Sequence, residues 1–281
     1  MSEHPPLPDE LAPVVVARPV GFPPLARPPS DLELPEVRRG DALLDLALVL
    51  LAAIILPYLP TLLAPLGVED VGMPEIGPLV IFQTWCQAGL AVAFLAYFVL
   101  RHRIRPASFG LRRDRVGGQV LWGLGALIGV YGALLATGLL VILVYLIWPE
   151  VEEDLVKRLP FVEQMPVDRL GTTLILLAAV AINEEVVFRG LLMPYLRRVL
   201  GSWWWAAVIS ALIFAGLHVP QQGVLGGGLQ IFAIGIVLAV FFVLSRSLLA
   251  VTLAHLLFNF AQFQIIHALP DVEELLERLQ E

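Results

Sequence analysis

Long apolar stretches alternate with short polar ones along the whole chain. The apolar runs cover residues 43–66, 78–100, 120–148, 170–197, 203–219, 229–244 and 248–266. A helix needs roughly 20 residues to cross about 30 Å of hydrocarbon, and nearly every run is about that long. Backbone polar groups must be paired inside lipid, which favours helices over open strands. The pattern therefore predicts an all-α, polytopic transmembrane helical bundle with about seven to eight spans.

The polar segments divide the chain into five predicted parts. Residues 1–40 contain ten prolines, which predict a disordered, proline-rich tail. Residues 41–149 hold the first transmembrane helices, and residues 150–169 form a polar segment at the membrane interface. A second set of transmembrane helices spans residues 170–266. Residues 267–281 are expected to form an acidic C-terminal tail.

The composition supports a membrane protein. Hydrophobic residues make up 58% of the 281 residues, and charged residues only 15%. The net charge of −7 gives no indication of a nucleic-acid partner. Cys86 is the single cysteine, so an intrachain disulfide and a Cys-rich zinc site are excluded, and we expect it to be a small core residue.

Basic residues in the short loops predict the orientation. The segment after the second run carries six arginines between residues 101 and 115, whereas the loop after the first run carries only acidic charges. Because basic loops stay on the cytoplasmic side, we expect residues 101–115 and the N-terminus to face the cytoplasm. The side of the C-terminus depends on whether the chain crosses seven or eight times.

Ionisable residues interrupt the later runs. An ionised side chain at the bilayer centre costs about 2.5–3.5 kcal/mol on insertion scales, so such residues are expected to face the bundle interior. The interiors of the first three runs hold none comparable. Glu185 and Arg189 are four apart and predict an ion pair, whereas Glu184 lies about 100° round the helix and stays available for other work.

Three short motifs follow one another on separate apolar runs. They are Glu184-Glu185-x-x-x-Arg189, Phe214-x-x-x-His218 and His255-x-x-x-Asn259. The set resembles the signature of the CAAX protease and bacteriocin-processing (CPBP, or Abi) family of intramembrane endopeptidases, which includes the type II CAAX prenyl endopeptidases. The resemblance covers roughly residues 170–262 and implies that residues 170–266 are the catalytic core.

The resemblance implies a role for each polar residue in peptide hydrolysis. Glu184 and His218 would activate a water molecule, with the Glu184 carboxylate as the general base. His255 and Asn259 would donate hydrogen bonds to the oxyanion. These four residues are the predicted catalytic set.

Three further residues are predicted to support the site. Glu185 and Arg189 would hold the helix and set the local field, and Phe214 would pack beside the site. The Glu185–Arg189 pair is equally compatible with a purely structural role, because any buried charge needs a partner.

A metal ion is the open question about cofactors. Glu184, His218 and His255 match the two-His, one-Glu ligand set of catalytic zinc. However, the chain has no His-Glu-x-x-His motif, and Asn259 is a poor zinc ligand but a good donor. We favour a site without a cofactor and keep zinc as the alternative.

We therefore expect an intramembrane endopeptidase in a bacterial cytoplasmic membrane. Its partners would be membrane lipid and a membrane-associated or lipid-anchored protein or peptide substrate. The alternative is a non-catalytic immunity or scaffold protein with the same fold. A proton-coupled carrier ranks last, because the chain shows no internal repeat.

Overall fold

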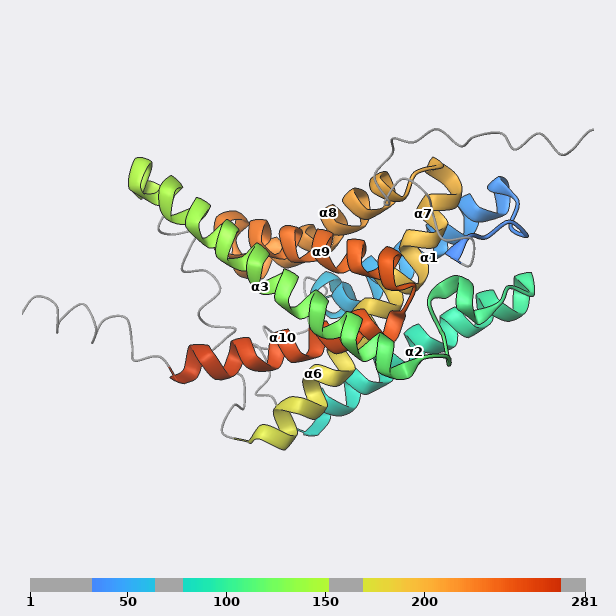
Figure 1. Ribbon diagram of the computed structural model, residues 1–281, viewed down its shortest axis with the longest axis horizontal. Helices are drawn as coiled ribbons and strands as arrows, with labels where there is room; N and C mark the ends of the chain where they lie inside the picture. The colour runs from blue at the N-terminus through green and yellow to red at the C-terminus, as the bar shows by residue number, and fades with distance from the viewer. Residues whose placement is uncertain (1–31, 64–77, 152–168, 269–281) are drawn as a thin grey trace, which may run out of the picture.

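The computed structural model describes residues 32–63, 78–151 and 169–268, and these residues form helices joined by short connections (Figure 1). No strand occurs within these ranges, so the predicted fold class is confirmed. Most of the predicted interfacial segment (152–168), of the acidic tail (269–281) and of the proline-rich tail (1–31) lies outside the described residues.

The helices follow the predicted apolar runs. The long ones are α1 (Arg39–Leu63), α2 (Pro78–His102), α3 (Val116–Ile147), α6 (Leu170–Glu185), α8 (Trp203–Gln222), α9 (Leu229–Ser245) and α10 (Leu248–Ala268). Three stretches are short: the single-turn η4 (Pro106–Phe109) and η5 (Pro149–Val151), and α7 (Met193–Leu200). Two π-helical turns also occur, η6 (Val186–Leu192) and η7 (Val224–Gly228).

Six helical stretches in the described part of the chain are long and apolar enough to cross a membrane. They are Val80–His102, Val116–Ile147, Leu170–Leu200, Trp203–Pro220, Val224–Ser245 and Leu248–Ile265. Together with α1, which has 25 residues, they agree roughly with the predicted number of spans.

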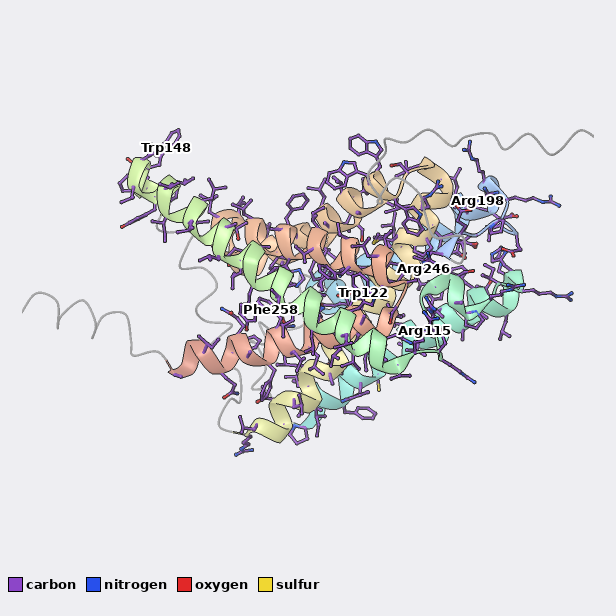
Figure 2. All side chains as sticks on the ribbon, in the orientation of Figure 1. Arg115, Trp122, Trp148, Arg198, Arg246 and Phe258 are labelled. Atoms are coloured by element: carbon purple, nitrogen blue, oxygen red, sulfur yellow. The ribbon has the colours of Figure 1, made fainter. Side chains whose placement is uncertain are left out.

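The core surrounds the η6–α7 segment, which begins directly after the two glutamates. Leu191, Met193 and Tyr195 are fully buried there. This segment packs against α1, α2 and α8, while α10 lies against both α3 and α6. Helix α3 runs past its neighbours at one end, where Trp148 is exposed (Figure 2). The core packing thus concentrates on the helices that carry the polar residues.

Residues 32–38, which the proline count assigned to the tail, contact the bundle. Leu32 and Val37 are fully buried in the core. The Nε atom of Arg198 donates to the backbone oxygen of Val37 (2.7 Å). Prolines remove helix donors but do not prevent burial, so this segment, which turns at residues 35–37, packs on the bundle ahead of α1.

The prediction that Cys86 is a core residue is wrong. Cys86 is exposed on the outer face of α2, beside the exposed side chains of Phe82 and Leu90. The physical reason is the solvent: a membrane helix is apolar on the face toward lipid as well as on the face toward the bundle.

The Gly223–Gly228 stretch forms a packed turn between α8 and α9. Gly226, Gly227 and Gly228 are buried in η7. A Cβ atom on Gly227 would lie 2.5 Å from the Cβ atom of Gln222. Glycine is therefore needed here for close packing against the end of α8.

Candidate active site

The two adjacent glutamates lie where α6 passes into the π-helical turn η6. Pro194 has no N–H to donate to the preceding turn, and the N–H of Met193 bonds the oxygen of Phe188, five residues back. Ser210 on α8 also donates to the Phe188 oxygen, at 3.4 Å. The helix thus continues through a wide turn that is held by the neighbouring helix.

Glu185 is the centre of a buried polar network. Its Oε1 atom accepts hydrogen bonds from Nη1 of Arg189 (2.8 Å) and from Nδ1 of His255 (2.7 Å). The predicted Glu185–Arg189 ion pair is therefore present, and the structure adds His255 to it. All three side chains are buried, which requires the charges to be paired in this way.

Arg189 connects this network to two more helices. Its Nη2 atom donates to the backbone oxygen of Gly235 on α9 (3.1 Å), and its Cζ atom lies 5.0 Å from the ring centroid of Phe214 on α8. A Cβ atom on Gly235 would lie 3.1 Å from the Cβ atom of Ala211, so glycine permits the close approach of α9 to α8.

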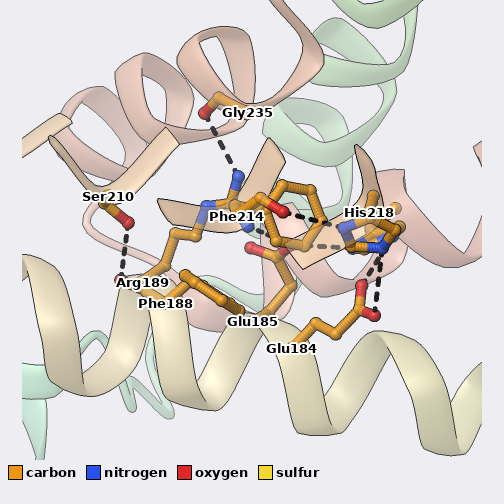
Figure 3. Close-up of polar contacts among 9 residues, drawn as sticks. Glu184, Glu185, Phe188, Arg189, Ser210, Phe214, His218 and Gly235 are labelled. Carbon is orange, nitrogen blue, oxygen red and sulfur yellow. Dashed lines mark hydrogen bonds and ion pairs between the residues drawn. The ribbon is translucent and has the colours of Figure 1, made fainter. Parts of the chain in front are cut away.

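Glu184 faces the imidazoles of His218 and His255, and Figure 3 shows its carboxylate beside His218. Its Oε2 atom lies 3.5 Å from Nε2 of His255, and its Oε1 atom lies 3.9 Å from Nε2 of His218. The three groups come from α6, α10 and α8. The side chains of Glu184 and His218 are 20% and 24% exposed, whereas that of His255 is 6% exposed, so the site is open on the side of Glu184 and His218.

The hydrogen-bond partners fix one proton on each imidazole. Nδ1 of His218 lies 2.8 Å from the backbone oxygen of Phe214, which can only accept, so Nδ1 carries the proton. Nδ1 of His255 likewise donates to the Glu185 carboxylate. In the neutral rings both Nε2 lone pairs therefore point toward the Glu184 carboxylate. Such a group of acceptors is suited to taking protons from a molecule placed among them.

Phe214 packs against the site through its ring. Its centroid lies 4.8 Å from that of His218 and 6.2 Å from that of His255, and both contacts are edge-to-face. Asn259 lies one turn beyond His255 on α10 and is half-buried. It makes no hydrogen bond with the other described residues, so the structure does not join it to the polar network.

A second buried polar pair lies at the edge of the first run, outside the run interiors for which the sequence predicts none. Asp45 on α1 is fully buried, and its Oδ2 atom accepts a hydrogen bond from Nε2 of His102 at the end of α2 (2.6 Å). Asp45 lies six residues into α1, about 9 Å along the axis, and it is therefore close to one end of the helix. The sequence does not indicate that Asp45 is buried, because this residue lies at the edge of the apolar run.

The donor atoms can be tested against a zinc ion. Each imidazole has its Nδ1 atom held by an acceptor, an arrangement also seen around zinc ligands, and glutamate is a usual third ligand. However, within the described ranges no group of three or more His, Cys, Asp or Glu residues is arranged to hold a metal ion. The choice between a site without a cofactor and a zinc site therefore stays a prediction.

Comparison with known proteins identifies the region that holds this site. Residues 166–261 match the family model described as "Type II CAAX prenyl endopeptidase Rce1-like". The predicted resemblance is confirmed for these residues. No curated protein and no solved structure matches the chain. The Rce1-like segment contains all three motifs and leaves out α1, α2 and α3.

The match and the helices together define the class of protein. Rce1-like proteins are a protease family, which supports a general role as a hydrolase. With six apolar helical stretches in its described part, the chain is an integral membrane protein. The membrane helices indicate a lipid environment, and the match to a protease family indicates a protein substrate.

Proposed function

We propose that the protein is an intramembrane endopeptidase that hydrolyses a peptide bond in a membrane-associated or lipid-anchored protein or peptide. The observation that carries the proposal is the convergence of the Glu184 carboxylate with Nε2 of His218 and of His255 from three separate helices. Ionisable groups at membrane depth are retained where they have partners or a task. Here the partners of Glu184 are the two imidazoles.

Glu184 and His218 are placed to activate water. A water molecule between them can donate one hydrogen to the carboxylate and one to Nε2 of His218, because both atoms are acceptors. As the water oxygen attacks the amide carbon, its proton passes to Glu184. Glu184 then returns this proton to the leaving amine as the carbon–nitrogen bond breaks.

His255 is proposed to donate to the oxyanion. Its Nδ1 atom already donates to Glu185, so this role uses the imidazolium form of the ring, with protons on both nitrogens. Glu185 holds the Nδ1 proton of that imidazolium at 2.7 Å. Nε2 can then donate to the oxyanion, together with the amide of Asn259.

The test is hydrolysis by the purified full-length protein in lipid, using a library of membrane peptides and lipid-anchored C-terminal peptides. Glu184→Gln keeps the size of the side chain but cannot take a proton. We expect it to lower the cleavage rate about 10²- to 10⁴-fold. Glu36→Gln makes the same chemical change at an exposed position outside the site and serves as the matched control.

The same assay separates the alternatives. Equal cleavage by the Glu184→Gln variant contradicts the role of the base, and lack of cleavage of every peptide by the unaltered protein supports the non-catalytic alternative. A chelator decides the metal question. Cleavage that persists supports the site without a cofactor, whereas loss that zinc reverses assigns Glu184, His218 and His255 to the metal.

A further inference from the structure

Three residues in the described part of the chain other than glycine have a positive φ angle, and all three are arginines. The angles are 53° at Arg103, 48° at Arg115 and 56° at Arg246. A Cβ atom is disfavoured in this left-handed conformation, which glycine adopts without cost. The protein therefore keeps a side chain at three positions where the backbone prefers none.

The three arginines lie at one end of the bundle. Arg103 follows α2, Arg115 precedes α3, and Arg246 separates α9 from α10. Two hydrogen bonds join these connections, from the Leu248 N–H to the Gly110 oxygen (2.9 Å) and from Ser247 Oγ to Gln119 Oε1 (2.6 Å). Figure 2 shows Arg115 and Arg246 at the end opposite Trp148.

The helix dipole accounts for only part of this arrangement. Arg103 and Arg246 follow the C-terminal ends of α2 and α9, where a positive charge is favourable. Arg115 stands before the N-terminal end of α3, where a positive charge is unfavourable. Both its backbone conformation and its charge are thus locally disfavoured, which points to a role for the side chain outside the fold itself.

Apolar side chains mark the depth of these arginines. Leu100, Leu111 and Val116 are exposed between them, as expected for residues in the hydrocarbon. Arg103, Arg105, Arg113 and Arg115, which lie in the connection between α2 and α3, are exposed. We call these four residues the arginine rim.

The neighbouring acidic group is already engaged. Asp114 accepts two hydrogen bonds from the guanidinium of Arg112, at 3.0 and 2.6 Å. This contact, with the nearby charge of Arg115, holds the pKa of the Asp114 carboxyl below its usual value, so the group is ionised. One carboxylate does not balance the rim arginines, and the rim keeps a net positive charge beside exposed apolar side chains.

We propose that the arginine rim binds the phosphate groups of anionic phospholipids. A guanidinium forms paired hydrogen bonds with phosphate oxygens, which an ammonium group cannot do. Lys157 is the single lysine among the 18 basic residues, so the chain uses arginine where lysine would serve equally well as a topology signal. We predict that this end faces the cytoplasm, where anionic lipids attract basic segments. The proposal is independent of the proposed peptidase activity.

The experiment counts lipids bound to the purified full-length protein after equilibration in micelles with equal amounts of phosphatidylglycerol and phosphatidylcholine. The test variant is Arg103→Gly/Arg115→Gly, because glycine suits a positive φ and should preserve the fold. The matched control is Arg38→Gln/Arg39→Gln, which removes the same charge from two exposed arginines outside the rim. The thermal midpoint of each variant is measured without anionic lipid.

We expect enrichment of phosphatidylglycerol on the unaltered protein and a loss of about fivefold for each rim arginine removed. The control should keep the enrichment, and inorganic phosphate at the same concentration should not abolish it. An unchanged test variant overturns the proposal, and so does an equal loss in the test and control variants. If the glycine variant fails to fold, Arg105→Gln/Arg113→Gln replaces it as the test variant. Both positions are exposed and have negative φ angles, and the same loss of phosphatidylglycerol enrichment is expected.

Discussion

Nδ1 of His255 donates a 2.7 Å hydrogen bond to Oε1 of Glu185, a residue 70 positions earlier in the chain. The same oxygen also accepts from Arg189. Glu185 thus fixes both the orientation and the proton position of the imidazole, while Arg189 supports the charge of the carboxylate. Glu185 is in this sense a positioning residue, one step removed from the reacting atoms.

The first prediction concerns this contact. Glu185→Gln should lower kcat about 10- to 100-fold, because the amide no longer stabilises an imidazolium at His255. The substrate KM should change little, because Glu185 does not contact the substrate. Steady-state kinetics on a cleaved peptide measure kcat and KM separately. An unchanged kcat with reduced thermal stability would instead assign Glu185 a structural role only.

Asn259 gives the second prediction. It makes no hydrogen bond with the other described residues, so Asn259→Ala should leave the thermal midpoint nearly unchanged. If its amide donates to the oxyanion, the same substitution should lower kcat about 10²- to 10³-fold with a similar KM. Steady-state kinetics on a cleaved peptide supply the readout. Retention of full kcat would remove Asn259 from the proposed mechanism.

Much of this arrangement can be predicted from the sequence. The apolar runs predict the helices, and the four-residue spacing predicts the Glu185–Arg189 pair, because both depend on local periodicity alone. The position of Glu184, about 100° round the helix from Glu185, predicts that it lies outside that pair. Its carboxylate instead faces the imidazoles of His218 and His255.

Other features leave no recognisable pattern. Gly235 accepts the hydrogen bond of Arg189 through its backbone oxygen, and it lies in an apolar helix. No polar side chain in the sequence therefore indicates this role. The outward position of Cys86 was missed because lipid-facing and interior faces are equally apolar. The π-helical turn follows from Pro194 together with a partner on another helix, Ser210, and such a tertiary contact cannot be read from local spacing.

The third prediction tests the contribution of Gly235. Gly235→Ala places a Cβ atom 3.1 Å from the Cβ atom of Ala211, which should separate α9 from α8 and cost about 1–3 kcal/mol. The shift also moves the Gly235 oxygen away from Arg189. Ala211→Gly removes the opposing Cβ atom, so the double variant should recover part of the loss. Thermal unfolding in detergent measures both, and no recovery in the double variant would exclude the steric explanation.

The last prediction concerns the buried pair that joins α1 to α2. Asp45 is fully buried, and removing its charge leaves His102 without its carboxylate partner, so Asp45→Asn should destabilise the protein by about 3–5 kcal/mol. His102→Gln should also destabilise it. Because the two side chains act as a unit, the double variant should lose less than the sum of the single losses, by about 0.5–3 kcal/mol. Thermal midpoints of the four proteins measure this coupling. Strict additivity would mean that the 2.6 Å contact contributes nothing to holding α1 against the bundle.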